Sequence, residues 1–296
     1  MENTPAKTGS VAGEWRLACG GLPWGARTLV MGVLNVTPDS FSDGGLYFDP
    51  ARALERAAQM VAEGADILDV GGESTRPGGE EVGAEEEVRR VVPVVAALAG
   101  RVGVPLSVDT TKALVAREAL AAGAGIVNDV SGLRFEPALA DEAARTGAGL
   151  VLMHSRGTRS TMHALPPSAD VLREVTESLR ASVAEAERRG VVRACIAVDP
   201  GVGFGKSQEQ NVELVARLDA FADAFPDLPV LVGTSRKRFV GALLGGAPVG
   251  ERLHGTMATV AAAVLRGAGI VRVHDVRAAV DTVRVADAIK AAAGGV

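Results

Sequence analysis

Polar side chains that could do chemistry recur along the chain, each where a short apolar segment ends. In chain order they are Asn35, Thr75, Arg76, Asp109, Asn128, His154, Asp199, Lys237, Arg272 and His274. Carboxylates and amides hydrogen-bond polar ligands, and an arginine offers a two-pronged fork to an anion. Arg272 and His274 lie two residues apart in an extended segment and therefore point the same way. Their joint occurrence indicates one functional site.

Taken singly, several of these residues have a simpler explanation. An Asp or Asn after a strand is commonly a helix cap or turn former, which applies to Asp109 and Asn128. Thr110 or Thr111 could cap the following helix instead, which would leave Asp109 for a ligand. His154 could simply bond a loop carbonyl. Glu73, His163 and His254 are interpreted as structural and are given no chemistry.

The apolar segments alternate with helical patterns, which predicts about eight buried parallel strands. The expected strands are 29–34, 65–70, 104–108, 125–127, 148–153, 194–198, 228–232 and 269–271. We predict a single (β/α)8 TIM barrel, because its strands would bring all the polar ends to one opening. A doubly wound open sheet is the alternative, and it would spread them along a line.

Composition agrees with one large domain. The 296 residues are 47% hydrophobic but only 3% aromatic, so the core must be built mainly from Ala, Val and Leu. We predict a flexible leader over residues 1–13 and the barrel over 14–296, starting with a short N-terminal hairpin within 15–28. Two isolated cysteines, Cys19 and Cys195, and the absence of a long apolar run favour a soluble cytoplasmic protein. A net charge of −5 indicates neither nucleic acid nor a membrane as partner.

Several longer motifs together resemble the dihydropteroate synthase family. They are Asn35-Val-Thr-Pro-Asp-Ser-Phe-Ser-Asp-Gly-Gly, Glu73-Ser-Thr-Arg-Pro-Gly, Val108-Asp-Thr, Asn128-Asp-Val, Asp199-Pro-Gly, Ser235-Arg-Lys and Arg272-Val-His-Asp-Val. The resemblance runs from about residue 29 to 288 and implies a parallel eight-stranded barrel. It also implies that 6-hydroxymethyl-7,8-dihydropterin diphosphate is joined to p-aminobenzoate, with release of diphosphate and formation of 7,8-dihydropteroate for folate synthesis.

The resemblance also implies roles for individual residues. It implies that the pterin is bound by Asp109, Asn128, Met153, Asp199 and Lys237. It places the diphosphate on Asn35, Thr75, Arg272 and His274, with Asn35 as the single protein ligand of Mg²⁺. It places p-aminobenzoate among Phe41, Thr75, Arg76, Pro77, Phe204 and Ser235. Asp109, Lys237 and Arg272 are the expected catalytic residues, and Asp109 would favour a dissociative path through a pterin cation.

Partners and rivals follow from the same resemblance. Sulfonamides would compete with p-aminobenzoate, and the small-residue stretch 256–265 would help to form a homodimer. A methyltetrahydrofolate-binding methyltransferase could share the barrel and pterin pocket, but it has no need of Asn35, Arg272 and His274 around a diphosphate. A non-catalytic pterin-binding paralogue is the second alternative, and it could have lost those residues.

Overall fold

The computed structural model describes residues 13–36, 50–73, 82–158, 161–162 and 164–294, and every structural statement concerns these residues. It begins with an antiparallel hairpin formed by β1 (Gly13–Leu17) and β2 (Gly20–Trp24). This confirms the hairpin predicted within 15–28. The predicted leader lies outside the described residues except for Gly13, which starts β1.

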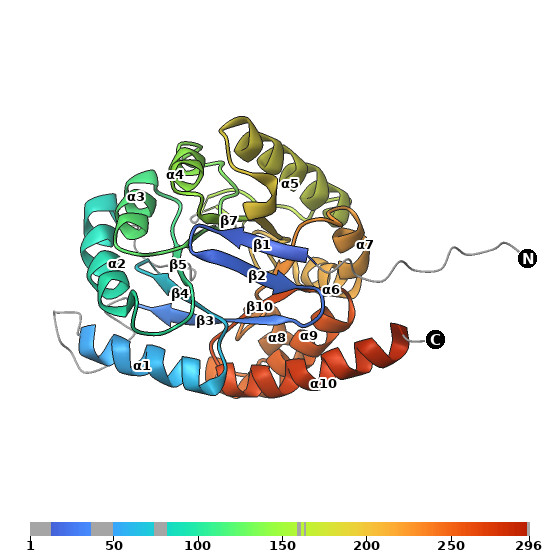
Figure 1. Cartoon of the computed structure of the whole chain (residues 1–296). Coiled ribbons are helices and arrows are strands. Elements are labelled where there is room, and N and C mark those ends of the chain that lie inside the picture. The colour runs from blue at the N-terminus through green and yellow to red at the C-terminus, as the bar shows by residue number, and fades with distance from the viewer. Residues whose placement is uncertain (1–12, 37–49, 74–81, 159–160, 163, 295–296) are drawn as a thin grey trace, which may run out of the picture.

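Eight further strands form one parallel sheet that curls into a barrel (Figure 1). They are β3 (Leu29–Asn35), β4 (Ile67–Gly71), β5 (Leu106–Asp109), β6 (Ile126–Asp129), β7 (Gly149–Met153), β8 (Ile196–Asp199), β9 (Leu231–Val232) and β10 (Ile270–Val273). Strand β3 pairs with both β4 and β10. A bridge between Val198 and Val230 brings β8 to the start of β9. Because this bridge joins β8 and β9, the two ends of the strand order, the sheet closes on itself, so the barrel prediction is confirmed and the open sheet is wrong.

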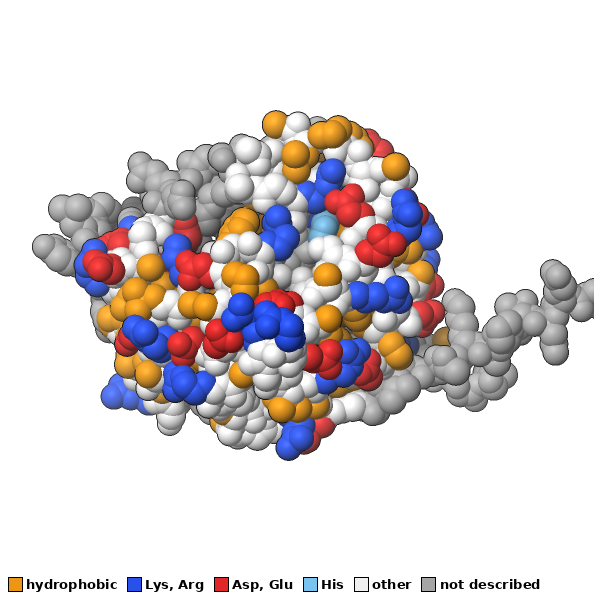
Figure 2. Space-filling view, turned by 90° about the horizontal axis from the view of Figure 1, so that it is seen from above, with side chains coloured by type: hydrophobic (Ala, Val, Ile, Leu, Met, Phe, Trp, Pro, Cys, Tyr) orange, Lys and Arg blue, Asp and Glu red, His pale blue; other side chains and the backbone are white. Residues whose placement is uncertain are grey.

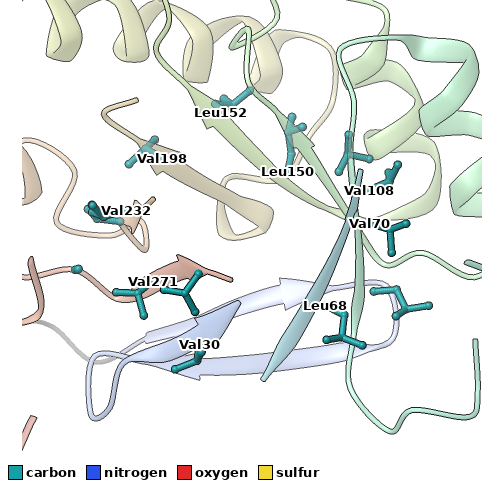
Figure 3. Close-up of a cluster of buried hydrophobic side chains, with 14 of the residues drawn as sticks. Val30, Leu68, Val70, Val108, Leu150, Leu152, Val198, Val232 and Val271 are labelled. Atoms are coloured by element: carbon teal, nitrogen blue, oxygen red, sulfur yellow. The ribbon is translucent and has the colours of Figure 1, made fainter. Parts of the chain in front are cut away.

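Helices follow the strands and surround the barrel (Figure 1). They are α1 (Pro50–Glu63), α2 (Ala84–Leu98), α3 (Ala113–Ala121), α4 (Leu139–Thr146), α5 (Val171–Arg188), α6 (Gln208–Ala216), α7 (Leu218–Asp223), α8 (Arg238–Leu243), α9 (Leu253–Leu265) and α10 (Val276–Gly294). The short 3₁₀ turns are η2 (Arg193–Cys195) and η3 (Val249–Glu251). Side chains that point outward from the strands pack beneath these helices. Figure 3 shows part of this layer, including Val30, Val70, Val108, Leu152 and Val271.

The start of α3 differs from the prediction that Thr110 or Thr111 caps it. The residue before the helix is Lys112, which makes no side-chain cap bond. The amide of Ala113 instead donates to Glu136 Oε2 at 2.7 Å, from the loop that follows the next strand. Thr110 Oγ1 accepts from the Lys112 amide at 3.2 Å, one residue before the helix. Asp109 does not cap this helix, so its carboxylate can serve the barrel interior.

The amino end of the barrel is plugged by the hairpin. Trp15, Leu17 and Trp24 pack against the lowest inward-facing strand residues, including Leu29 and Ile270. Trp15 is fully buried, and its Nε1 donates to Cys195 O at 2.8 Å. This end is therefore apolar and closed, which leaves the carboxyl end, called the mouth below, for polar chemistry.

The outer surface carries interspersed charges. On the face shown in Figure 2, acidic and basic side chains alternate without a large patch of one sign. Within the described part of the chain, no helix is both long and apolar enough to cross a bilayer.

Candidate active site

Strand register brings the predicted pterin and diphosphate residues to the mouth. Asp109 pairs with Asn128 across β5 and β6, and Met153 pairs with Asp199 across β7 and β8. Asn35 pairs with Gly71, which in turn pairs with Asp109. Residues two apart in a strand share a face, and the buried inward residues Ile126, Val151, Ala197 and Ile270 lie two positions before Asn128, Met153, Asp199 and Arg272. Asn128, Asp199 and Arg272 therefore lie with Met153 in the layer directly above the apolar plug.

Arg272 lies between two carboxylates. Its Nε donates to Asp69 Oδ2 at 2.6 Å, and its Nη2 donates to Asp109 Oδ2 at 2.7 Å. Burial alone would lower the pKa of Arg272, but the two carboxylates raise it above its ordinary value. Burial raises the pKa of Asp109, and Arg272 only partly offsets this effect. Arg272 therefore stays a cation within a buried acid–base cluster.

Asp199 and Lys237 define another side of the mouth. Asp199 Oδ1 accepts from the Gly201 amide at 2.7 Å, which fixes the carboxylate above β8. Burial raises the pKa of Asp199, and nearby Lys237 opposes this. Burial also lowers the pKa of Lys237 to about 8, against the attraction of Asp199. The Lys237 ammonium donates to Val202 O and lies 4.5 Å from the centre of the Phe204 ring.

Ser235 and His274 form a hydrogen-bonded pair between the ends of β9 and β10. Ser235 Oγ accepts from the His274 amide at 3.2 Å and lies 2.9 Å from His274 Nδ1. Arg236 between Ser235 and Lys237 has a φ of 58°, an unusual value for a residue with a side chain. Its guanidinium is fixed by both carboxylate oxygens of Asp275, at 2.5 and 3.0 Å. This turn places Ser235 and Lys237 in the same wall of the mouth.

Some predicted site residues cannot be placed. Phe41, Thr75, Arg76 and Pro77 lie outside the described residues. Met153 is buried beside Asp199, which suits a ring contact, and Phe204 lies under Lys237. Of the six residues expected to bind p-aminobenzoate, the structure thus describes Phe204 and Ser235.

Two lysines that the motifs did not single out organise the neighbouring loops. Lys206 donates to the carbonyls of His154, Gly201 and Phe204 at 3.2, 2.7 and 3.1 Å. It thereby joins the loops after β7 and β8 directly behind Asp199. Lys112 pairs with the buried carboxylate of Glu87 and with Glu73 at 2.7 Å. Glu73 is thus part of an ion-pair cluster, in agreement with its structural interpretation.

His154 is buried behind the mouth, and its environment excludes the charged form. Burial lowers its pKa to about 2, assisted by Lys206, Arg134 and Arg156. A neutral imidazole of this kind cannot act as an acid near neutral pH. The suggested bond from its side chain to a loop carbonyl is not seen: Nδ1 has no hydrogen-bond partner among the described residues.

Asp69 is the residue that sequence reasoning missed. It is fully buried in the middle of β4, and its Oδ2 also accepts from Asn128 Nδ2 at 3.0 Å. The search for polar residues at strand ends passed over it because it precedes the end of its strand. The signal that could have found it is strand alternation: Asp69 is two residues after the inward-facing Ile67.

Asn35 is the predicted metal ligand, and its side chain can be tested against the ligand preferences of Mg²⁺. Its amide supplies an oxygen at the end of β3, and oxygen is the ligand atom that Mg²⁺ prefers. The described residues include no group of three or more His, Cys, Asp or Glu arranged to hold a metal. Mg²⁺ commonly binds through one or two protein oxygens and completes its shell with water and substrate phosphate. Asn35 therefore fits a magnesium ion that arrives with a diphosphate.

Comparisons with known proteins agree on one family. The family described as pterin binding enzyme matches residues 31–274. The dihydropteroate synthase of Synechocystis sp. is 47% identical over 266 residues, which cover 90% of this chain and 91% of that protein. The structure of Burkholderia cenocepacia dihydropteroate synthase complexed with 7,8-dihydropteroate has a TM-score of 0.85 at 43% identity, covering 96% of this chain and 99% of that one. A Yersinia pestis dihydropteroate synthase with a sulfonamide drug complex has a TM-score of 0.84 at 42% identity, covering 90% and 95%.

The fold and the site define a (β/α)8-barrel enzyme with paired acids and bases gathered at the carboxyl ends of its strands. The chain belongs to the pterin-binding enzyme family and, within it, to the dihydropteroate synthases, transferases of folate biosynthesis.

Proposed function

We propose that this dihydropteroate synthase joins 6-hydroxymethyl-7,8-dihydropterin diphosphate to p-aminobenzoate through a dissociative pterin cation at the barrel mouth. The observation that carries the proposal is the joint position of Asp109, Asp199 and Arg272 at that opening. The C–O bond to diphosphate breaks first, and its electron pair leaves with the diphosphate. The amine lone pair of p-aminobenzoate then forms the C–N bond, and the amine loses a proton to solvent.

The pterin is recognised by groups that match its edge. The carboxylate of Asp199 accepts from the ring amide N–H and the exocyclic amine, and the ammonium of Lys237 donates to the ring carbonyl. Asn128 donates one N–H to Asp69, so its oxygen and second N–H serve the pterin. Asp109 supplies a fixed anion near the developing cation, and Met153 covers the ring face.

The diphosphate is held by Arg272, His274 and Asn35, with Thr75 as the fourth expected contact. Nε and Nη2 of Arg272 already bind Asp69 and Asp109, so a phosphate oxygen would bind Nη1. Arg272 therefore contributes charge and one donor to the leaving group instead of a full two-pronged contact. When bound at Asn35, Mg²⁺ would neutralise negative charge on the departing diphosphate.

p-Aminobenzoate enters beside the leaving group. Phe204 packs against its ring and Ser235 holds its carboxylate, with Phe41, Thr75, Arg76 and Pro77 as further contacts. A neutral arylamine already carries its lone pair, so the mechanism needs no strong base and no covalent enzyme intermediate. The sulfonamide complex of the Yersinia pestis relative supports sulfonamides as inhibitors of this chain, and we propose that they compete with p-aminobenzoate.

The test is diphosphate release from the pterin substrate with Mg²⁺, with and without p-aminobenzoate. We expect equal amounts of diphosphate and dihydropteroate when the amine is present. With ¹⁸O in the bridge between carbon and phosphorus and no amine, reversible C–O cleavage would move label into non-bridging positions. Such exchange would support the dissociative path, whereas an α-deuterium kinetic isotope effect of unity at the reacting methylene carbon would contradict it. Pterin binding without any turnover would favour the non-catalytic paralogue, and methyl transfer from methyltetrahydrofolate would favour the methyltransferase.

We also propose a cytoplasmic homodimer formed through α9 and α10. Leu265, Val285 and Ile289 are large apolar residues on these helices that are 45%, 61% and 54% exposed. They lie around a shallow groove with Ala261 and Ala286, a small-residue surface that permits close helix packing. Replacing Val285 and Ile289 together by Glu should yield a monomer in sedimentation analysis, whereas Arg284→Glu beside them serves as a charge control. An unchanged mass in the double variant would contradict this interface.

A further inference from the structure

Asp69 is a carboxylate buried where a strand interior normally carries an apolar side chain. It lies between Leu68 and Val70 and has no exposed surface. Burying an ionised carboxylate costs much free energy unless it is paired and hydrogen-bonded. Its pairing partners are Arg272 and Asn128, both expected to contact the pterin substrate. The interactions that offset the free-energy cost of burying Asp69 thus come from residues of the proposed site and not from the hydrophobic core.

The second carboxylate oxygen of Asp69 lies beside another buried polar group beneath the mouth, the hydroxyl of Ser107. Asp69 Oδ1 is buried and has no hydrogen-bond partner among the described residues, and the same holds for Ser107 Oγ. Asp69 and Ser107 are register partners on β4 and β5, and Ser107 lies two residues before the inward-facing Asp109. Two adjacent buried groups of this kind are commonly joined by an ordered water.

We propose that Asp69 is the positioning residue of the pterin site, anchored below by Ser107 through a buried water and orienting Arg272 and Asn128 above. The inference rests on the proposed pterin site and adds a residue to it that acts without touching substrate. Its Oδ2 accepts from both neighbours at once, at 2.6 Å from Arg272 Nε and 3.0 Å from Asn128 Nδ2.

This arrangement fixes two orientations that the reaction needs. The bond to Asn128 sets which end of its amide faces the ligand, since Asp69 Oδ2 accepts from Arg272 and would repel the amide oxygen. The bond to Arg272 Nε sets the plane of the guanidinium, whose Nη2 then meets Asp109. Without Asp69, Arg272 could rotate toward Asp109 or the diphosphate, and Asn128 could flip.

The test is a double-mutant cycle between Asp69 and Arg272, with Asp129 as the matched control. Asp129 is also a buried Asp, but its oxygens accept from the amides of Ser131 and Leu133. Measured on folded enzyme, Asp69→Asn should reduce kcat/KM for the pterin diphosphate by about 10- to 100-fold. In an Arg272→Met background the same change should cost less than about threefold, because coupled residues are not additive. Asp129→Asn should lower stability and have the same kinetic effect in both backgrounds.

The outcomes distinguish a failure of the positioning role from a failure of the proposed function. Wild-type enzyme that fails to release diphosphate overturns the function itself. Active wild type with equal losses from Asp69→Asn in both backgrounds, or with no loss at all, overturns the positioning role.

Two measurements keep the inference testable if Asp69→Asn does not fold. In wild-type enzyme, the Arg272 Nε–H resonance, assigned by its loss in Arg272→Met, should be shifted downfield and exchange slowly with water. Fast exchange would contradict the bond to Asp69. A high-resolution crystal structure should show one water between Asp69 Oδ1 and Ser107 Oγ that is lost or moved in Ser107→Ala. Direct contact of either atom with another protein group would overturn the water-mediated anchor.

Discussion

The carboxylate of Asp199 is the group at the mouth on which the proposed recognition of the pterin edge most depends. Its carboxylate is held by the Gly201 amide and faces Lys237. Asp199→Asn keeps the shape but removes the charge and one of two acceptors. We expect pterin affinity to fall by about 10- to 100-fold, which calorimetric titration with the pterin alone would measure. Asp141→Asn, on the exposed surface of α4, serves as the control, and equal affinities in all three proteins would refute the assignment.

Lys237 gives a prediction for pH. Burial lowers its pKa to about 8, so the ammonium is present below this pH and is lost as the pH rises through it. Pterin binding should therefore weaken as the pH rises above 8. Lys237→Arg, which stays charged, should bind less tightly because of its shape but should lack this decline. A wild-type profile that is flat to pH 9.5 would contradict the role of the ammonium.

Whether a site residue could be predicted from the sequence depended on its position relative to the end of a strand. Asp109, Asn128 and Asp199 could be predicted because each directly follows an expected apolar strand, at 104–108, 125–127 and 194–198. Asp69 could not be found by that rule because it lies inside the expected strand 65–70. Asp69 also occupies Nε of Arg272, so the guanidinium is not free for a two-pronged contact with an anion. Only the three-dimensional structure reveals this pairing.

At the scale of elements, Lys206 joins two loops that carry site residues. Its ammonium bonds three carbonyls, including that of Gly201 next to Asp199. Lys206→Met would leave these carbonyls without a donor and loosen the turn. We expect the pterin KM to rise about tenfold with a smaller change in kcat. Lys290→Met on α10 is the control, and a loss of stability without any KM change would assign Lys206 a purely structural role.

The hairpin β1–β2 is an element for stability and not for catalysis. Trp15 is fully buried against the lowest layer of the barrel, at the end opposite the mouth. Trp15→Ala should cost about 3 to 5 kcal/mol of unfolding free energy in urea titrations. The kinetic constants of the folded enzyme should stay within about twofold of wild type, since the contact does not reach the mouth. Lost turnover at unchanged stability would show that the plug is coupled to the site.

Apolar periodicity can be recognised in the sequence only where a helix is long enough. Helices α2 and α5 span 15 and 18 residues and show the pattern, whereas α7 and α8 have six residues each. A helix of six residues offers fewer than two turns, so no repeat can be recognised. The cap of α3 was missed because Glu136 reaches it from another loop. Such long-range contacts are not encoded in local sequence.

For the whole molecule, His154 links stability to pH. Its pKa is about 2 in the folded state, whereas an unfolded chain binds the proton near pH 6.5. Below pH 6.5 the unfolded state therefore binds more protons, and stability falls as the pH falls. This group alone should remove about 2 kcal/mol between pH 6.5 and pH 5. His154→Leu should flatten that part of the urea-unfolding profile, and an unchanged slope would contradict the neutral buried state.

The central claim is that one mouth gathers residues from all eight barrel strands and their loops around a pterin and its diphosphate, and a crystal structure of the complex tests it most directly. Crystals soaked with 6-hydroxymethyl-7,8-dihydropterin diphosphate and Mg²⁺ should show the ring edge on Asp199, Asn128 and Lys237. The diphosphate should lie on Arg272 Nη1 and His274, with the metal at Asn35. A ring bound on the outer helices, or turned so that its amide edge lies away from Asp199, would contradict the account.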